Sequence, residues 1–128
     1  MSAPSQISPQ LLERINDAID SWNRGDVAQL LSHYAEDVAL SSPMSGPPGQ
    51  GSSWLQGREE VAGHKINMRS VIPNVKLVDI LKGSGFVTLL LDSGTRYFTM
   101  TFEPDDDCRA RRVIICHGQD RAEHPHAS

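Results

Sequence analysis

The chain has 128 residues, the length of one ordinary domain and enough to bury a hydrophobic core. Its formal net charge is −4, and its basic residues gather only at Arg109, Arg111 and Arg112, which argues against nucleic-acid binding. No apolar run approaches the roughly 20 residues of a membrane span. The first ten residues lack the basic and apolar regions of a secretion signal, so we expect a cytoplasmic protein.

The first third of the chain predicts two helices. Residues 1–7 are rich in Ser, Pro and Gln, which is typical of a flexible leader. Ser8 is a good N-cap, Pro9 suits the first helical position, and Gly25 suits the C-terminal stop, so we expect a helix between them. The spacing of three and four predicts one apolar stripe on it, made of Leu11, Leu12, Ile15, Ala18, Ile19 and Trp22.

A second, short helix is predicted to begin at Asp26, whose carboxylate can accept from the free N–H groups of the first turn. The helical spacing after it includes Val27, Leu30, Leu31 and Tyr34. Ala35, Glu36 and Asp37 break this period, and residues 38–42 alternate like a short strand that Pro43 ends. We expect His33, on the short helix, to be a surface residue.

The tract from Met44 to Trp54 is dense in Gly, Pro and Ser and predicts a mobile loop. Residues 56–73 then predict a third helix, with acidic residues in its first turn and Pro73 at its end. One face of this helix carries Val61, Lys65, Met68 and Ile72, with Ala62, Ile66 and Arg69 beside it.

The second half of the chain predicts strands over residues 75–81, 86–92, 95–103 and 109–116. Helices followed by a meander of long strands indicate the α+β class, with the helices on one face of an antiparallel sheet. We expect one domain over residues 8–118, with flexible tails at residues 1–7 and 119–128.

A two-residue turn at Ser93 and Gly94 places Leu91 opposite Arg96 and Leu89 opposite Phe98. One face of the hairpin is then apolar except for Arg96 and belongs under the helices. The other face carries Thr88, Leu90, Tyr97, Thr99 and Thr101. We interpret this second face as a contact between two copies of the chain, and the alternative is an ordinary half-solvated face.

Three stretches carry a resemblance to a known superfamily. They read WNRGDVAQLLSHYAEDVALSSP, then LQGREEV, then FEPDDDCRARRVII. In this order they resemble the nuclear transport factor 2-like superfamily, and within it the SnoaL-like polyketide cyclase and ketosteroid-isomerase-like group. The resemblance covers about Ser8 to Gly118. It implies a cone, in which a strongly curved sheet wraps three helices and opens at one end into an apolar pocket, and it implies a homodimer.

The resemblance also indicates which chemistry to expect. Ketosteroid isomerases need a carboxylate base, a first-helix tyrosine and a protonated acid. The matching positions here are Ser42, Ala18 and Phe98. A serine hydroxyl is too weak a base at neutral pH to replace the carboxylate, so we do not expect isomerase activity. Epoxide hydrolases of this fold have an Arg where this chain has Arg96, but their acid falls on Phe98.

The remaining polar residues near the expected pocket are candidates for a site. Tyr34 matches a tyrosine of the active-site network in isomerase-like relatives. His117 continues the inward register of the last strand and can act as an acid or base near neutral pH, or else it faces water. We therefore predict Tyr34, Arg96 and His117 as catalytic candidates. The predicted ligand-binding residues are Trp22, Ser42, Trp54, His64, Lys65, Met68, Phe98 and Met100.

Arg96 is the sharpest anomaly, because a buried guanidinium needs an acceptor. The two alternatives are an anionic or carbonyl ligand and a side chain that extends out to solvent at the strand end. No grouping of His, Cys, Asp or Glu has the spacing of a metal site, so we expect no metal and no cofactor.

Two function classes follow. The first is a SnoaL-like domain that binds a small apolar or weakly acidic molecule, with a cyclase-, isomerase- or hydrolase-like reaction left open. The second is a non-catalytic module for homodimerisation or protein interaction. A void of ligand size inside the cone would favour the first class over the second.

Overall fold

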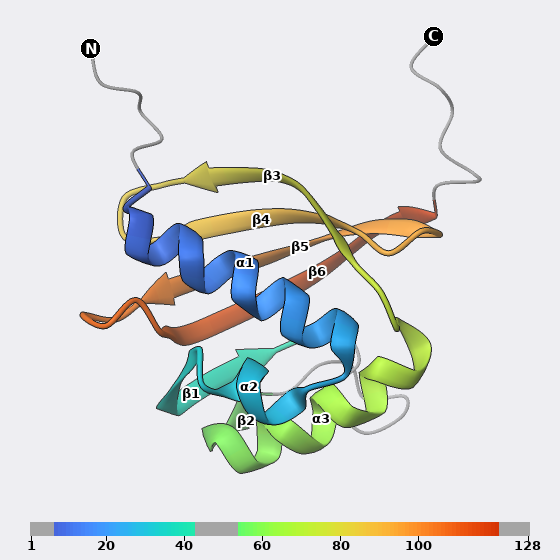
Figure 1. Ribbon diagram of the computed structural model, residues 1–128, viewed down its shortest axis with the longest axis horizontal. Helices are drawn as coiled ribbons and strands as arrows, with labels where there is room; N and C mark the ends of the chain where they lie inside the picture. Colours follow the sequence, from blue (N-terminus) through green and yellow to red (C-terminus); the bar gives the residue numbers. More distant parts are fainter. Residues whose placement is uncertain (1–6, 43–53, 121–128) are drawn as a thin grey trace, which may run out of the picture.

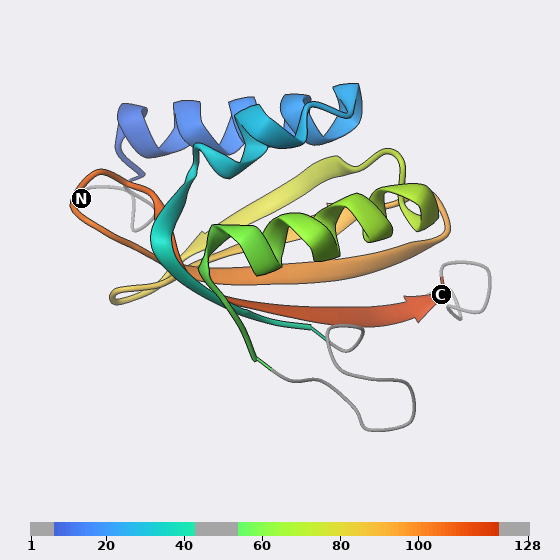
Figure 2. The same ribbon diagram turned by 90° about the horizontal axis from the view of Figure 1, so that it is seen from below.

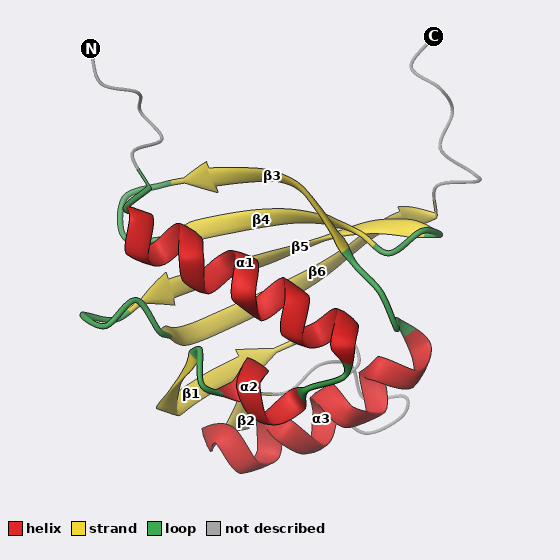
Figure 3. Cartoon of the chain, viewed as in Figure 1, coloured by secondary structure: helices red, strands yellow, loops and turns green. Residues whose placement is uncertain are grey.

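The computed structural model describes residues 7–42 and 54–120. Most of the predicted leader, most of the predicted loop and most of the C-terminal tail lie outside the described residues. The element order is α1 (Pro9–Arg24), α2 (Val27–Leu31), β1 (Tyr34–Ser41), β2 (Trp54–Gln56), α3 (Gly57–Val71), β3 (Lys76–Lys82), β4 (Val87–Asp92), β5 (Arg96–Pro104) and β6 (Ala110–Asp120) (Figures 1 and 3). In the part of the chain that the structure describes, no helix is long and apolar enough to cross a membrane.

The strands form one curved sheet in the order β2-β1-β6-β5-β4-β3. The long strands β3 to β6 pair antiparallel with one another, as the meander predicts. The edge is different, because β1 joins β6 in parallel and then pairs antiparallel with β2. The helices lie on one face of this sheet, so its inner face and the helices enclose the core (Figures 1 and 2). The mixed α+β fold is the one expected.

The predicted start and end of α1 and the predicted start of α2 are confirmed. The Ser8 hydroxyl accepts a hydrogen bond from the Leu11 N–H at 3.1 Å, and Gly25 ends α1 with a left-handed φ of 78°. The Asp26 carboxylate accepts from the Gln29 N–H at 3.1 Å and so caps α2. These local contacts are readable from sequence because cap and capped group lie within four residues of each other.

The predicted end of α2 is wrong. The helix stops at Leu31, and Tyr34 is the first residue of β1 rather than a residue of the helix. His33, expected on the helix, lies in the turn between them. Residues far away in the sequence determine where β1 begins. Tyr34 pairs with Ala110 of β6, and its carbonyl accepts two hydrogen bonds from Arg58 of α3. The spacing of apolar residues within a segment cannot predict such partners.

The predicted hairpin register is wrong by two residues. Asp92 pairs with Tyr97 and Leu91 with Phe98, so four residues form the turn, closed by a hydrogen bond of 3.0 Å from the Ser93 N–H to the Arg96 carbonyl. A shift of two keeps every side chain on its predicted face. The inner face is therefore apolar as expected, with buried residues Val87, Leu89, Leu91, Phe98 and Phe102.

One strand was not predicted, and another is longer than predicted. Residues Trp54–Gln56 form β2, because they pair with Ala39–Ser41 of β1 instead of belonging to a loop. Strand β6 continues to Asp120, past the predicted end of order at Gly118. In both cases the segment pairs with a neighbouring strand, and this pairing cannot be predicted from the local sequence.

Candidate functional site

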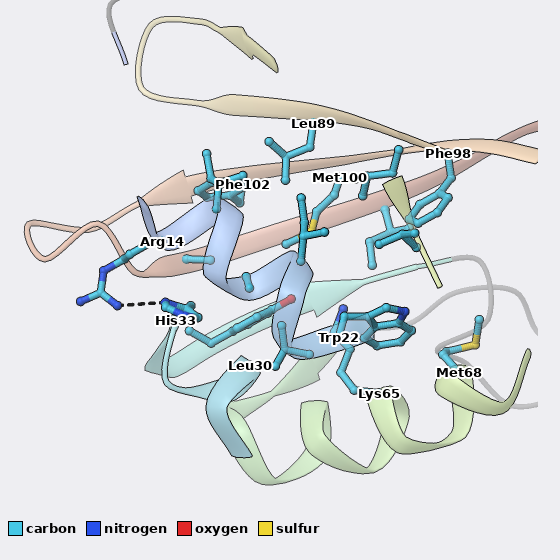
Figure 4. A pocket seen from close by; sticks show the side chains of 18 of the residues that line it. Arg14, Trp22, Leu30, His33, Lys65, Met68, Leu89, Phe98, Met100 and Phe102 are labelled. Atoms are coloured by element: carbon cyan, nitrogen blue, oxygen red, sulfur yellow. Dashed lines mark hydrogen bonds between the residues drawn. The ribbon is translucent and has the colours of Figure 1, made fainter. Parts of the chain in front are cut away.

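A cavity of about 110 Å³ lies between the helices and the inner face of the sheet. Trp22 reaches it from α1 and Met68 from α3, while Leu89, Phe98 and Met100 approach from the sheet (Figure 4). Most of its lining is aliphatic or aromatic, and none of the described residues that line it is Asp or Glu. The polar residues in the lining are Arg14, His33, Tyr34, Ser42, His64 and Lys65.

The cavity gathers most of the side chains that the sequence proposed. Eight predicted site residues line it: Trp22, Tyr34, Ser42, His64, Lys65, Met68, Phe98 and Met100. They come from α1, β1, the end of β1, α3 and β5, so the closure of the cone brings them together.

Three predicted site residues are absent from the described lining of this cavity. Trp54 is 43% exposed on β2, where the Arg112 guanidinium lies 5.7 Å from its ring centroid. Arg96 lies at the turn end of β5 and is absent from the lining, so its predicted place opposite Leu91 is corrected. His117 pairs with Phe98 along the backbone, but its side chain lies outside what the structure describes.

Tyr34 is buried at the base of the site. Arg58 holds its backbone carbonyl with two hydrogen bonds, of 2.9 Å from Nε and 2.6 Å from Nη2. A planar guanidinium that donates twice to one carbonyl fixes the start of β1 against the start of α3. The side chain of Tyr34 is thereby held in place as one wall of the cavity.

Trp22 forms a second wall, and its orientation is also fixed. Its indole N–H donates to the Ile72 carbonyl at 2.9 Å, which ties α1 to the end of α3. Arg69 strengthens the same junction, because it donates to the carbonyls of Trp22 and Asn23 at 2.6 and 2.9 Å. These carbonyls belong to the last turn of α1, where helix carbonyls lack partners within the helix.

Lys65 lies between these two walls and is 7% exposed. Its ammonium nitrogen is 5.6 Å from the centroid of the Trp22 ring and 5.5 Å from that of Tyr34. Both distances are within the range of a cation–π interaction. The two aromatic faces therefore hold a cation at the wall of an apolar cavity. Figure 4 shows Lys65 beside Trp22.

Ser42 and His64 form a polar pair in the lining. The Ser42 hydroxyl is buried, and its Oγ lies 3.3 Å from Nε2 of His64 on α3. Ala18 and Phe98, which the sequence matched with Ser42 to the three isomerase positions, also line the cavity.

The sequence prediction missed a polar cluster of Arg14, Asp17 and His33, and it wrongly placed His33 at the surface. The His33 side chain is only 11% exposed and lines the cavity. The guanidinium of Arg14 lies 3.1 Å from its Nδ1, and the carboxylate of Asp17 lies 2.6 Å from its Nε2. Arg14 has only donors, so Nδ1 accepts and the ring donates to Asp17 through Nε2.

Asp17 is the acid of this group. Hydrogen bonds from Gln29 and from His33, in that order of importance, lower the pKa of its carboxyl. The only sequence signal was that Arg14 and Asp17 fall one helical turn apart beside the apolar stripe. Nothing in the spacing showed that the turn before β1 would bring His33 between them.

The arrangement is suited to binding a small molecule through the shape of the cavity, the positive charge of Lys65 and a few hydrogen bonds. Among the residues that the structure covers, no group of three or more His, Cys, Asp or Glu side chains is placed to hold a metal ion. Cys108, in the turn before β6, lines the cavity as a free thiol.

Comparison with known proteins defines the fold. No protein-family model and no curated protein matches the chain. A SnoaL-like protein of unknown function from Burkholderia thailandensis is similar in structure, with a TM-score of 0.77 and 25% identity over 88% of this chain and 99% of that one. An NTF2-like protein of unknown function from Burkholderia pseudomallei has a TM-score of 0.68 and 18% identity, over 87% of this chain and 92% of the other.

A de novo designed protein with a curved β-sheet matches with a TM-score of 0.69, at 12% identity over 88% of each chain. This match separates fold from function, since a fold reached by design carries no activity with it. The natural relatives have the same strand and helix arrangement over nearly their whole length. The chain therefore has the fold of these nuclear transport factor 2-like proteins and is similar to a SnoaL-like protein at 25% identity.

Proposed function

We propose that this protein binds a small, largely apolar molecule with an acidic or carbonyl group in the cavity of its cone. The cavity itself is the observation that supports the proposal, because the core side chains Trp22, Met68, Phe98 and Met100 leave it open instead of filling it. Its volume of about 110 Å³ is of the same order as the roughly 150 Å³ apolar cavity that accepts benzene in an engineered protein.

Two methionine methyl groups provide a direct test. Met68 and Met100 line the cavity, and the other two methionines of the chain, Met1 and Met44, lie outside the described residues. Protein labelled with ¹³C at the methionine methyls is titrated with toluene, benzyl alcohol and benzaldehyde. We expect saturable shifts of the Met68 and Met100 signals, which Met68→Leu and Met100→Leu assign. A spectrum unchanged by every probe would contradict the proposal.

A filled cavity serves as the matched control. Ala18 lines the cavity from α1, so Ala18→Leu places extra carbon atoms where the ligand would lie. Ala28, on α2, is exposed, so Ala28→Leu adds the same atoms at the surface. We expect Ala18→Leu to abolish the probe-dependent shifts and Ala28→Leu to leave them intact. Equal binding in both variants would place the probe outside the cone.

We also expect no ketosteroid isomerase activity, because Ser42 stands where the carboxylate base is needed. A steroid enone isomerisation assay, followed by absorbance, tests this with wild-type protein and Ser42→Ala. Turnover that disappears in Ser42→Ala would contradict this expectation.

A further inference from the structure

We propose that Lys65 is the anchor for a ligand carboxylate, so that the natural ligand is a small apolar monoanion. This proposal rests on the proposed function and adds the charge of the ligand to it. Lys65 is the feature of the cavity that needs explanation, because this residue is only 7% exposed and lines a largely apolar cavity while carrying an ionisable amine.

The described residues offer this ammonium no negative partner. None of the hydrogen bonds or ion pairs among them includes Lys65, and the ion pairs they form belong to Arg24, His33 and Arg109. No Asp or Glu is found among the described lining of the cavity. With no counter-charge in the described lining, this ammonium is available to pair with the anionic group of a ligand.

The two rings explain why a cation is retained there. Trp22 and Tyr34 present their faces to the Lys65 ammonium at 5.6 and 5.5 Å, and aromatic faces attract cations. An aromatic ring attracts a cation but is a poor hydrogen-bond acceptor. The ammonium has three N–H donors, so it can still donate hydrogen bonds to a ligand. Both rings are held in place by other contacts, through Ile72 for Trp22 and Arg58 for Tyr34. The cation is thus positioned before any ligand arrives.

A single negative charge fits this site better than a phosphate. The second cation in the lining, Arg14, already donates to the Asp107 carbonyl and to His33. Lys65 is therefore the cation that remains for a ligand, and the surrounding wall is apolar. A carboxylate on a hydrocarbon or aromatic body matches one ammonium in such a wall.

Benzoate and benzamide test the charge, since they have nearly the same shape and only benzoate is ionised at neutral pH. Binding is measured on the methyl signals of Met68 and Met100. We expect wild-type protein to bind benzoate at least about tenfold more tightly than benzamide, the size of one charge-assisted hydrogen bond. Lys65→Met should reduce this preference to about twofold or less while toluene still binds. The matched control is Lys76→Met, at an exposed lysine of β3.

Each outcome decides the question. If toluene binds but wild-type protein does not prefer benzoate over benzamide, the carboxylate anchor is wrong and the binding function stands. If no probe binds, both proposals fail. If Lys65→Met does not fold, reductive methylation of the wild-type protein is used as the test instead. Benzoate, but not benzamide, should slow the methylation of Lys65 relative to that of Lys76, as measured by mass spectrometry. Equal methylation with and without benzoate would overturn the proposal.

Discussion

Gly25 ends α1 with a φ of 78°, and a Cβ atom there would lie 3.2 Å from Nη2 of Arg69. Two costs therefore apply to Gly25→Ala: the left-handed backbone and the displacement of a guanidinium that binds the last carbonyls of α1. We expect a loss of about 1–3 kcal/mol in the free energy of unfolding. Urea unfolding followed by circular dichroism measures it.

Gly63 supplies the opposite expectation. It lies inside α3, and an added Cβ would meet nothing within 4 Å. Gly63→Ala should raise the stability by about 0.5–1 kcal/mol, because alanine loses less conformational freedom in a helix. Equal losses in Gly25→Ala and Gly63→Ala would show that the conformation and contacts of Gly25 are unimportant.

Asp17 makes a prediction about pH. Its carboxyl pKa is lowered from the ordinary value of 3.8, mainly by hydrogen bonds from Gln29 and His33, with smaller charge effects of His33 and Arg24. A carboxyl with a lowered folded-state pKa stabilises the fold above its unfolded pKa, and this stabilisation is lost as the pH falls through the folded pKa. The advantage of wild-type protein over Asp17→Asn should thus be constant near neutrality and disappear in acid below 3.8.

Thermal unfolding of both proteins across this range measures the effect. Asp20→Asn, in the same helix, is the control for removing one negative charge. A difference between wild type and Asp17→Asn that grows as the pH falls would contradict the prediction.

At the scale of elements, the junction between β1 and α3 positions the site. The carbonyl of Tyr34 accepts both hydrogen bonds of Arg58, at 2.9 and 2.6 Å. Lysine keeps the charge but not the two parallel donors, so Arg58→Lys should lower the stability by about 1–2 kcal/mol. Arg24→Lys, at an exposed arginine, is the control and should change it by less than about 0.5 kcal/mol. Equal values in the two variants would argue against this role of Arg58.

The same junction shows how far the sequence leads. Caps such as Ser8 and Asp26, the apolar stripe of α1 and the alternating faces of β4 and β5 depend on neighbours in sequence. They were predicted correctly, except that Leu12 of the stripe is 40% exposed. The start of β1 at Tyr34 depends on partners 24 and 76 residues away, Arg58 and Ala110, and was missed. Periodicity reports which face is apolar, but not which strand lies beside it.

The candidate site follows the same division. Residues on a predicted inner face, such as Met68 and Phe98, reach the cavity. Arg96 does not, because a four-residue turn replaces the expected two-residue turn. His33 was missed because its surroundings are made by the packing of α1 against the turn before β1.

At the scale of the whole molecule, the outer face of the sheet carries a row of side chains that crosses four strands. Paired residues place Leu81, Thr88, Thr101 and Ile114 side by side. The hydroxyls of Thr88 and Thr101 lie 2.9 Å apart, and Leu81 and Ile114 are 63% and 45% exposed at the ends of the row. Apolar groups at this exposure, joined by threonines that satisfy each other, are suited to contact with another sheet.

We predict that a second copy of the chain covers this face, so that the protein is a homodimer. A stable dimer buries about 800 Å² on each partner, and the curved face of four long strands offers a continuous surface for it. Ile114→Arg places a charge within the expected contact, where burial without a partner is costly. Ile66 is also exposed, but it lies on α3 instead of the sheet, so Ile66→Arg is the matched control. In sedimentation velocity at micromolar concentration we expect dimers for wild type and Ile66→Arg, and monomers for Ile114→Arg. The prediction is wrong if the wild-type protein is a monomer. The outer face is also not the dimer contact if Ile66→Arg is a monomer while Ile114→Arg is still a dimer.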